Sequence, residues 1–160
     1  MRKEQKIWLW ALIAAIGLGI TSVGHALENE SEAVSAAENG FYEALNTFFT
    51  GDVGPMKEVW SHADDVTYMG PSGGFQKGWP AVLEVWEKTA AMKLGGKVTP
   101  QRLHLTVSGD LAVIQTHELG ENVDKEGNPL EVHIRATNLF RKENGKWKMI
   151  GHHTDLLPYL

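Results

Sequence analysis

Residues 130–157, LEVHIRATNLFRKENGKWKMIGHHTDLL, decide the fold of this chain. Asn144 and Gly145 separate two alternating hydrophobic runs, and Asn-Gly between such runs is the strongest short-range signal of a β-hairpin. A two-residue turn fixes the register, so that three pairs are expected on one side of the sheet: Phe140 with Met149, Asn138 with Gly151, and Ala136 with His153. That side is apolar near the turn and polar far from it. The pattern predicts a concave face that is packed at one end and open to a small ligand at the other.

The rest of the chain predicts two helices, a short hairpin and a third helix before a run of four strands. The expected helices span residues 27–50, 56–60 and 79–93. The expected strands span 65–69, 75–77, 98–108 and 111–123, followed by the two arms of the hairpin. This order favours an α+β domain in which the helices cover one face of a curved antiparallel sheet.

Residues 1–26 have the features of a secretory signal peptide. A basic start is followed by an apolar run over residues 7–20, and Gly24-His25-Ala26 offers the small residues that a signal peptidase reads. We therefore expect a periplasmic or secreted protein and a mature domain over 27–160. The continuation of the run to Val23 leaves an uncleaved membrane anchor as the alternative. Because the chain has no Cys, it has neither a lipidation site nor a disulfide.

The mature chain is acidic. Removal of the expected signal peptide takes away three positive charges and one negative charge, and the formal net charge changes from −5 to −7. An acidic surface without a basic patch argues against nucleic acid and against anionic membrane surfaces as partners. The remaining expected partner is a small molecule.

Two groups of residues form a pattern along residues 32–155. The first group contains Phe41-Tyr42-Glu43-Ala44-Leu45-Asn46, Gly51-Asp52, and Trp60 with Asp64-Asp65-Val66-Thr67. The second contains Gly78, Phe140-Arg141-Lys142, and Gly145-Lys146-Trp147-Lys148-Met149-Ile150 with His153. Together they resemble the SnoaL-like domains of the nuclear-transport-factor-2-like (NTF2-like) superfamily. The second group is most similar to the branch that includes the association domain of calcium/calmodulin-dependent kinase.

This resemblance implies a cone-shaped, curved, mostly antiparallel sheet wrapped on three N-terminal helices around a pocket, often as a homodimer. Members of the superfamily include isomerases, cyclases, dehydratases, binding proteins and assembly domains, so the fold does not fix the function. Two positions lack the groups of the ketosteroid isomerase branch. Gly70 stands where that branch has its carboxylate base, and Phe41 stands where it has a phenol. The basic pocket positions of the kinase association domain correspond to Glu118 and Asn138.

Histidine is the most informative residue type, because six of the seven histidines follow the expected signal peptide. Imidazole transfers protons near neutral pH and binds borderline metals. Alternation along the strands places His153 and Asp155 on the inner side, and pairing across residues 124–129 is expected to bring His117 beside them. These three residues are the candidate catalytic group. The same three form an alternative metal site of two His and one carboxylate, although no compact metal-binding spacing is present and we expect no cofactor.

Further polar and aromatic residues are candidates for binding a ligand without chemistry. They are Tyr42, Trp60, Tyr68, Trp86, His104, Gln115 and Asn138. Of the aromatic ones, Trp86 is expected mainly in the core, and Trp60 and Tyr42 at the mouth of the pocket. Glu118 and Arg135 are expected to form an ion pair on the solvated face of the sheet, and a register shift of one residue would move them into the pocket.

The sequence thus supports two hypotheses. The first is an exported domain that binds a small, largely apolar molecule and possesses His-mediated acid/base chemistry without a cofactor. The second is a non-catalytic homo-oligomerisation module. A pocket lined by His117, Asn138 and His153 favours the first, whereas a filled cone with an apolar outer sheet face favours the second.

Overall fold

The computed structural model describes residues 28–71, 73–124 and 126–156. The expected signal peptide at residues 1–26 lies outside this part of the chain. No helix within the described residues is long and apolar enough to cross a membrane.

The elements follow the order expected from the sequence. A long helix covers residues 28–48, and two further helices are α2 (Gly54–Val59) and α3 (Trp79–Ala90). The strands are β1 (Thr67–Gly70), β2 (Gly73–Lys77), β3 (Lys97–Ser108), β4 (Leu111–Val123), β5 (Pro129–Glu143) and β6 (Lys146–Leu156). Pro55 and Pro80 lie in the first turns of α2 and α3, where a missing backbone N–H costs nothing.

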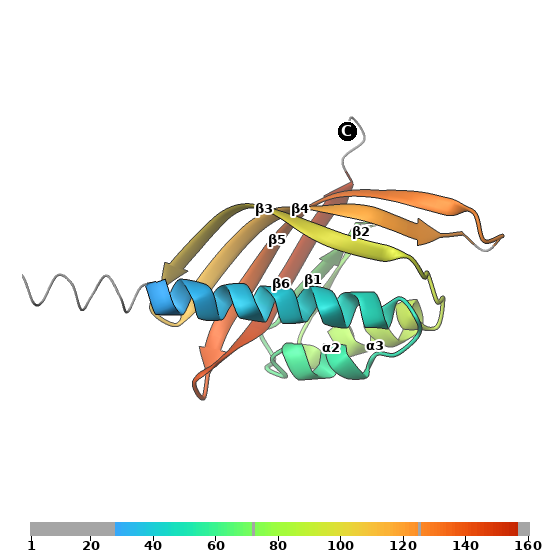
Figure 1. Ribbon diagram of the computed structural model, residues 1–160. Helices are drawn as coiled ribbons and strands as arrows, with labels where there is room; N and C mark the ends of the chain where they lie inside the picture. Colours follow the sequence, from blue (N-terminus) through green and yellow to red (C-terminus); the bar gives the residue numbers. More distant parts are fainter. Residues whose placement is uncertain (1–27, 72, 125, 157–160) are drawn as a thin grey trace, which may run out of the picture.

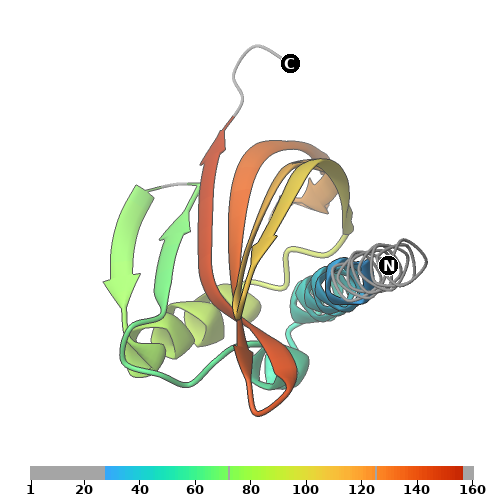
Figure 2. The same cartoon turned by 90° about the vertical axis from the view of Figure 1, so that its left-hand side faces the viewer.

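The six strands form one mixed sheet in the order β2-β1-β6-β5-β4-β3. All neighbouring strands are antiparallel except β1 and β6, which are parallel. The sheet curves strongly, and the helices lie on its concave side (Figures 1 and 2). The long helix lies under the β3–β4 side and α3 under the β1–β2 side (Figure 2). The expected α+β cone is confirmed.

The core forms where the helices meet the concave face. Val34, Phe41, Leu45 and Phe48 of the long helix recur at helical spacing and are 0–5% exposed. Phe48 contacts Trp86 of α3 edge to face, with ring centroids 4.9 Å apart. Each fully buried aromatic or aliphatic side chain contributes about 1.5–3 kcal/mol. These contacts therefore fix the two helices against the same strands.

The β5–β6 hairpin begins as predicted. Asn144 and Gly145 form the turn with φ of 51° and 79°, and positive values at both positions are typical of a two-residue hairpin turn. Phe140 pairs with Met149, as predicted. Beyond this pair the register shifts, because Ile150 is an extra residue in β6 and Leu139 pairs with Gly151.

This bulge changes the side of the sheet on which each later residue of β6 lies. Asn138 pairs with His152 instead of Gly151, and Ala136 pairs with Thr154 instead of His153. The register predicted beyond the bulge is therefore wrong. Side chains alternate with a period of two, so one inserted residue transfers every following side chain to the opposite face.

The pairing of β4 with β5 also differs from the prediction. His117 pairs with Arg135 and Gln115 pairs with Thr137, so His117 and Gln115 lie on the outer face with the odd-numbered residues of β5. Glu118 pairs with Ile134 on the inner face. The predicted ion pair between Glu118 and Arg135 is therefore absent, because the two residues lie on opposite faces.

Candidate functional site

A cavity of about 300 Å³ lies between the concave face of the sheet, the long helix and α3. Its lining is mostly apolar. The long helix contributes Leu45 and Phe48, α3 contributes Trp86, and β5 contributes Val132 and Ile134. The polar side chains that line it include Glu118 and His152. The cone is thus hollow, and the ionisable side chains of Tyr68, Glu118 and His152 line its interior.

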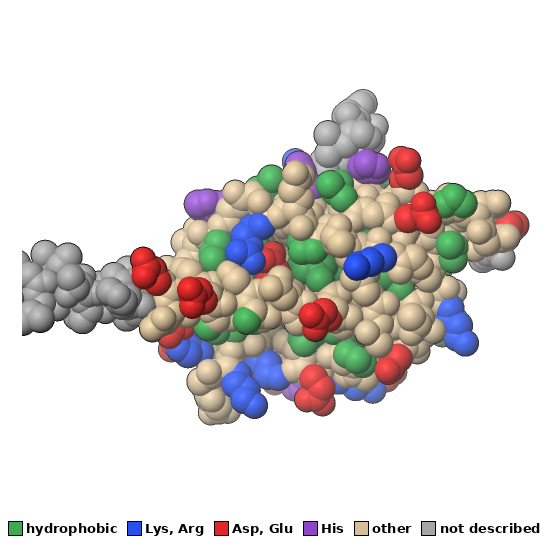
Figure 3. All heavy atoms as spheres, viewed as in Figure 1, with side chains coloured by type: hydrophobic (Ala, Val, Ile, Leu, Met, Phe, Trp, Pro, Cys, Tyr) green, Lys and Arg blue, Asp and Glu red, His purple; other side chains and the backbone are tan. Residues whose placement is uncertain are grey.

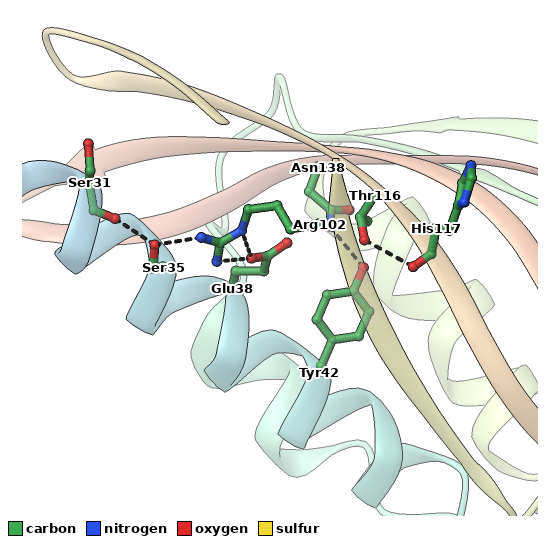
Figure 4. A network of polar contacts seen from close by, with 8 residues as sticks. All are labelled: Ser31, Ser35, Glu38, Tyr42, Arg102, Thr116, His117 and Asn138. Carbon is green, nitrogen blue, oxygen red and sulfur yellow. Dashed lines mark hydrogen bonds and ion pairs between the residues drawn. The ribbon is translucent and has the colours of Figure 1, made fainter. Parts of the chain in front are cut away.

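A chain of buried hydrogen bonds supports Glu118 and His152. The Tyr42 hydroxyl donates to Glu118 Oε1 over 2.9 Å, and Asn138 Nδ2 donates to the Tyr42 hydroxyl over 3.1 Å. His152 Nδ1 lies 2.7 Å from Asn138 Oδ1. All four side chains are at most 4% exposed. The network connects the long helix to three adjacent strands, and Figure 4 shows its Tyr42–Asn138 bond.

The directions of these bonds determine the tautomer of His152. The amide nitrogen of Asn138 donates to Tyr42, so its oxygen accepts a hydrogen bond from the protonated Nδ1 of His152. The other ring nitrogen, Nε2, then carries a lone pair and lies 3.7 Å from Glu118 Oε1. Two acceptor atoms therefore approach each other when Glu118 is ionised. A proton on Glu118, or a donor group of a ligand, removes this repulsion.

Burial shifts the pKa values of both groups toward neutral forms. Burial raises the pKa of Glu118 to about 7, and the hydrogen bond from Tyr42 opposes this shift. Burial, and to a smaller extent the charge of His153, lowers the pKa of His152 to about 3. Between these values both side chains are neutral. Glu118 gains and loses its proton in the range that general acid/base catalysis at neutral pH requires.

Hydrogen-bond donors are also present at the cavity. Tyr68 lines it and is 9% exposed. Burial and the charge of Glu118 raise the pKa of Tyr68 to about 12, so the phenol keeps its proton at neutral pH. The indole N–H of Trp86, a residue that also lines the cavity, is buried without a partner within the described chain. The cavity thus combines a titratable carboxyl with neutral donors.

A second buried carboxylate lies one helical turn before Tyr42. Arg102 on β3 donates to Glu38 through both Nε and Nη2, and its Nη1 donates to Ser35 Oγ over 2.9 Å (Figure 4). Glu38 is 1% exposed, and its Oε1 has no partner among the described residues. This ion pair joins the long helix to β3 beside the site.

The structure does not bring the candidate catalytic group of His153, His117 and Asp155 into the cavity. His153 lies on the outer face, where its Nε2 is 3.0 Å from Thr67 Oγ1. Asp155 forms an exposed ion pair with Arg135 at 3.3 Å. The three side chains share a face as expected, but it is the outer one: the bulge at Ile150 places His153 and Asp155 there, and the pairing of β4 with β5 places His117 there. The described residues contain no group of three or more His, Cys, Asp or Glu arranged to hold a metal ion.

The candidate ligand-binding residues fall into three groups. Tyr68 and Trp86 line the cavity, and Tyr42 and Asn138 lie behind it and support Glu118 and His152. Tyr42 and Trp60 are 3% and 1% exposed, so the expectation that they lie at the mouth is wrong. Trp60 packs in the core against Trp86, and Trp86 reaches the cavity. The remaining two, His104 and Gln115, are exposed on the outer face.

Two central residues were missed as candidates, namely Glu118 and His152. The sequence signal for Glu118 is that a register shift of one residue moves it into the pocket, and the same shift in β6 moves His152 inward in place of His153. The phenol that Phe41 cannot supply is present one residue later, at Tyr42.

A sheet curved around helices and closed over a mostly apolar cavity is the architecture of NTF2-like pocket domains. The SnoaL-like domain family matches residues 34–157, and the chain belongs to this family. In sequence, it is 26% identical over 102 residues to the F-box protein SKIP8 of Arabidopsis thaliana. This match covers 64% of the chain and 41% of the plant protein, so the chain spans about two fifths of the length of this relative.

Two solved structures are similar in fold. One is named as a calcium/calmodulin-dependent protein kinase type II association domain from Thiobacillus denitrificans; it is 26% identical, with a TM-score of 0.66, over 77% of this chain and 94% of that one. The other is named as a dehydratase of the NTF2-like family from Streptomyces avermitilis; it is 24% identical, with a TM-score of 0.73, over 82% and 98% of the two chains. Their names point to different functions, so the site must decide between them.

Proposed function

We propose that this domain binds a small, largely apolar molecule in the cavity and transfers a proton on it through Glu118. The observation that carries the proposal is the position of a single buried carboxyl, with a pKa of about 7, on the wall of an otherwise mostly apolar cavity. Strongly perturbed pKa values in a cleft are typical of functional sites.

The size and polarity of the cavity support ligand binding. Its volume of about 300 Å³ is at the lower end of the range of small-molecule sites, roughly 300–1,000 Å³. Apolar walls supply binding free energy, and a few convergent polar atoms orient the ligand. His152 Nε2 accepts a hydrogen bond from the ligand, and the Tyr68 hydroxyl donates one.

The proposed step is proton abstraction from a carbon next to a carbonyl group. Ionised Glu118 takes the proton, and the electron pair of the broken C–H bond moves into the carbonyl to form an enolate. The neutral phenol of Tyr68 donates a hydrogen bond to the enolate oxygen and stabilises its charge. Protonated Glu118 then returns the proton to the same or a neighbouring carbon, which completes exchange or isomerisation.

Hydrogen exchange on a simple ketone tests this proposal. We expect the protein to accelerate the exchange of the α-hydrogens of cyclohexanone in deuterated water, measured by NMR, with a rate that rises with pH around an apparent pKa near 7. Glu118→Gln is expected to lower the rate at least about 100-fold, the lower range for loss of a general base. The matched control is Glu121→Gln, which makes the same change at an exposed position of β4.

A rate that is unchanged in Glu118→Gln would refute the assignment of Glu118. Absence of acceleration in the unmodified protein, together with absence of cyclohexanone binding by calorimetry, would refute the function itself.

A second candidate function is self-association through the outer face of the sheet. Leu111 and Val113 of β4 are 52% and 36% exposed there, and Leu139 pairs with Val113. Exposed apolar side chains in one patch favour a second copy of the chain as partner. Sedimentation should then give the mass of a dimer, which Val113→Asp dissociates and Phe75→Asp on β2 leaves intact. A monomer at every concentration would exclude this function.

A further inference from the structure

An apolar track leads out of the cavity along β5. Ile134, Val132 and Leu130 occupy alternate positions and therefore share the inner face of the strand. Ile134 and Val132 line the cavity, whereas Leu130 lies beyond it and is 48% exposed. The inner face of β5 thus continues as an apolar surface past the cavity mouth.

A second hollow, of about 420 Å³, begins where the first one ends. Met92 and Leu94 line both hollows, and Val123 and Leu130 complete the apolar part of the second. Met92 is 62% exposed, so its side chain is accessible to a ligand. The two hollows are therefore adjacent at Met92 and Leu94, and we call the two together the path.

The walls of this path are held in place by hydrogen bonds. Val123 N donates to Leu94 O over 2.7 Å, and Asn122 Nδ2 donates to Gly95 O over 2.8 Å. These bonds fasten the segment after α3 to the end of β4. In Figure 1 this end of β4 and β5 projects past the helices, and Figure 3 shows hydrophobic side chains at the surface there, beside acidic ones.

We propose that the natural ligand is an elongated amphipathic molecule with a hydroxyl or carbonyl head and an unbranched hydrocarbon tail. The head lies at Glu118 and His152, and the tail leaves the cavity between Met92 and Leu94 and lies along the inner face of β5 to Leu130. This inference rests on the proposed binding function and adds the shape and class of the ligand. The acidic side chains Asp124 and Glu126 at the far hollow disfavour a tail that ends in an anion.

Two straight-chain alcohols of different length test the proposal. Dodecan-1-ol carries four more methylene groups than octan-1-ol, and the proposal places these additional groups in the second hollow. We expect dodecan-1-ol to bind at least about tenfold more tightly by calorimetry, because each additional buried methylene adds to the affinity. Leu130→Asp should remove most of this difference by lowering the affinity for dodecan-1-ol.

The control variant is Leu103→Asp, which introduces the same charge at a leucine of β3 that is 54% exposed and lines neither hollow. It should leave the difference between the two alcohols unchanged. Binding of octan-1-ol without a gain for dodecan-1-ol, or a gain that Leu130→Asp does not reduce, would refute the tail path alone. Absence of binding by both alcohols would instead contradict the proposed binding function.

Discussion

Gly70 and Tyr68 lie so close on the inner face of β1 that a Cβ atom at position 70 would be 2.5 Å from the Tyr68 hydroxyl oxygen. Both residues line the cavity. The glycine therefore leaves the space that the phenol occupies. Gly70 thus supplies no carboxylate base, but its lack of a side chain allows the Tyr68 hydroxyl to lie in the site.

Gly70→Ala should displace the Tyr68 ring and lower the free energy of unfolding by about 1–3 kcal/mol, the usual cost of overpacking. Urea denaturation measures this change. In a Tyr68→Phe background the cost should be smaller, because the closest clashing atom is gone. Gly40→Ala is the matched control, since a Cβ there meets nothing within 4 Å, and it should stabilise the long helix by about 0.5–1 kcal/mol.

Glu118→Gln should change how stability depends on pH. The folded-state pKa of Glu118, about 7, lies above the ordinary value of 4.5, so between these values the folded state binds a proton that the unfolded state has lost. This contribution is therefore fully present below pH 4.5 and is lost as the pH rises through 7, by up to about 3 kcal/mol. Relative to Glu118→Gln, the unmodified protein should lose stability across this window in urea titrations. A constant difference between the two proteins would contradict a raised pKa.

His152→Ala and His153→Ala should have very different effects although the residues are adjacent. Loss of His152 leaves Asn138 Oδ1 without its donor and opens space in the core, at a cost of about 2–4 kcal/mol. Loss of His153 removes a partly exposed contact with Thr67 and should cost less than about 1 kcal/mol. Equal effects in urea denaturation would mean that the bulge does not set which ring is buried.

The linkage of His152 to pH has the opposite sign from that of Glu118. Its folded-state pKa is lowered to about 3 from 6.5, so the unfolded state binds the extra proton and stability rises as the pH increases from 3 to 6.5. His152→Gln should flatten this rise, and His104→Gln, at an exposed position on the outer face, serves as the control.

Arg102→Met should lower stability by roughly 3 kcal/mol, because it leaves the buried carboxylate of Glu38 without its cation. The double variant with Glu38→Met should recover most of this loss, since both charges are then absent. Chemical denaturation of the two single variants and the double variant gives the coupling between the residues. A double variant that is as unstable as Arg102→Met alone would contradict this explanation. It would show that the pair stabilises the fold through packing and not through charge.

The elements of the fold could be predicted because their signals are local. Asn144-Gly145 defines its own turn, and β4 was predicted with its observed bounds, Leu111–Val123, from alternation between two turn signals. The boundaries of α3 were less certain, since the helix ends at Ala90 instead of Lys93.

The residues of the site could not be predicted in the same way, because strand register decides which side chains face the cavity. Register is set by pairing between residues that are distant in the sequence. The bulge at Ile150 has no distinctive signal in the sequence, because Met149 and Ile150 are both apolar and either residue can face the core. The register of β4 with β5 depends on contacts along the whole length of both strands. The connecting residues 124–129 contain no two-residue turn motif from which this register can be predicted. Glu118 and His152 were consequently assigned to the wrong face, whereas Tyr68, whose position depends on a short strand, was assigned to the cavity.

Ile150 has a consequence for how this domain diverges. The two histidines that follow it are chemically identical but lie in different environments, one fully enclosed and neutral, the other partly exposed on the outer face. Deletion of a single residue between the turn and position 152 would exchange their roles without substituting either ring. Relatives must therefore be compared by strand pairing, since matched letters in an alignment can stand for a site in one protein and for plain surface in another.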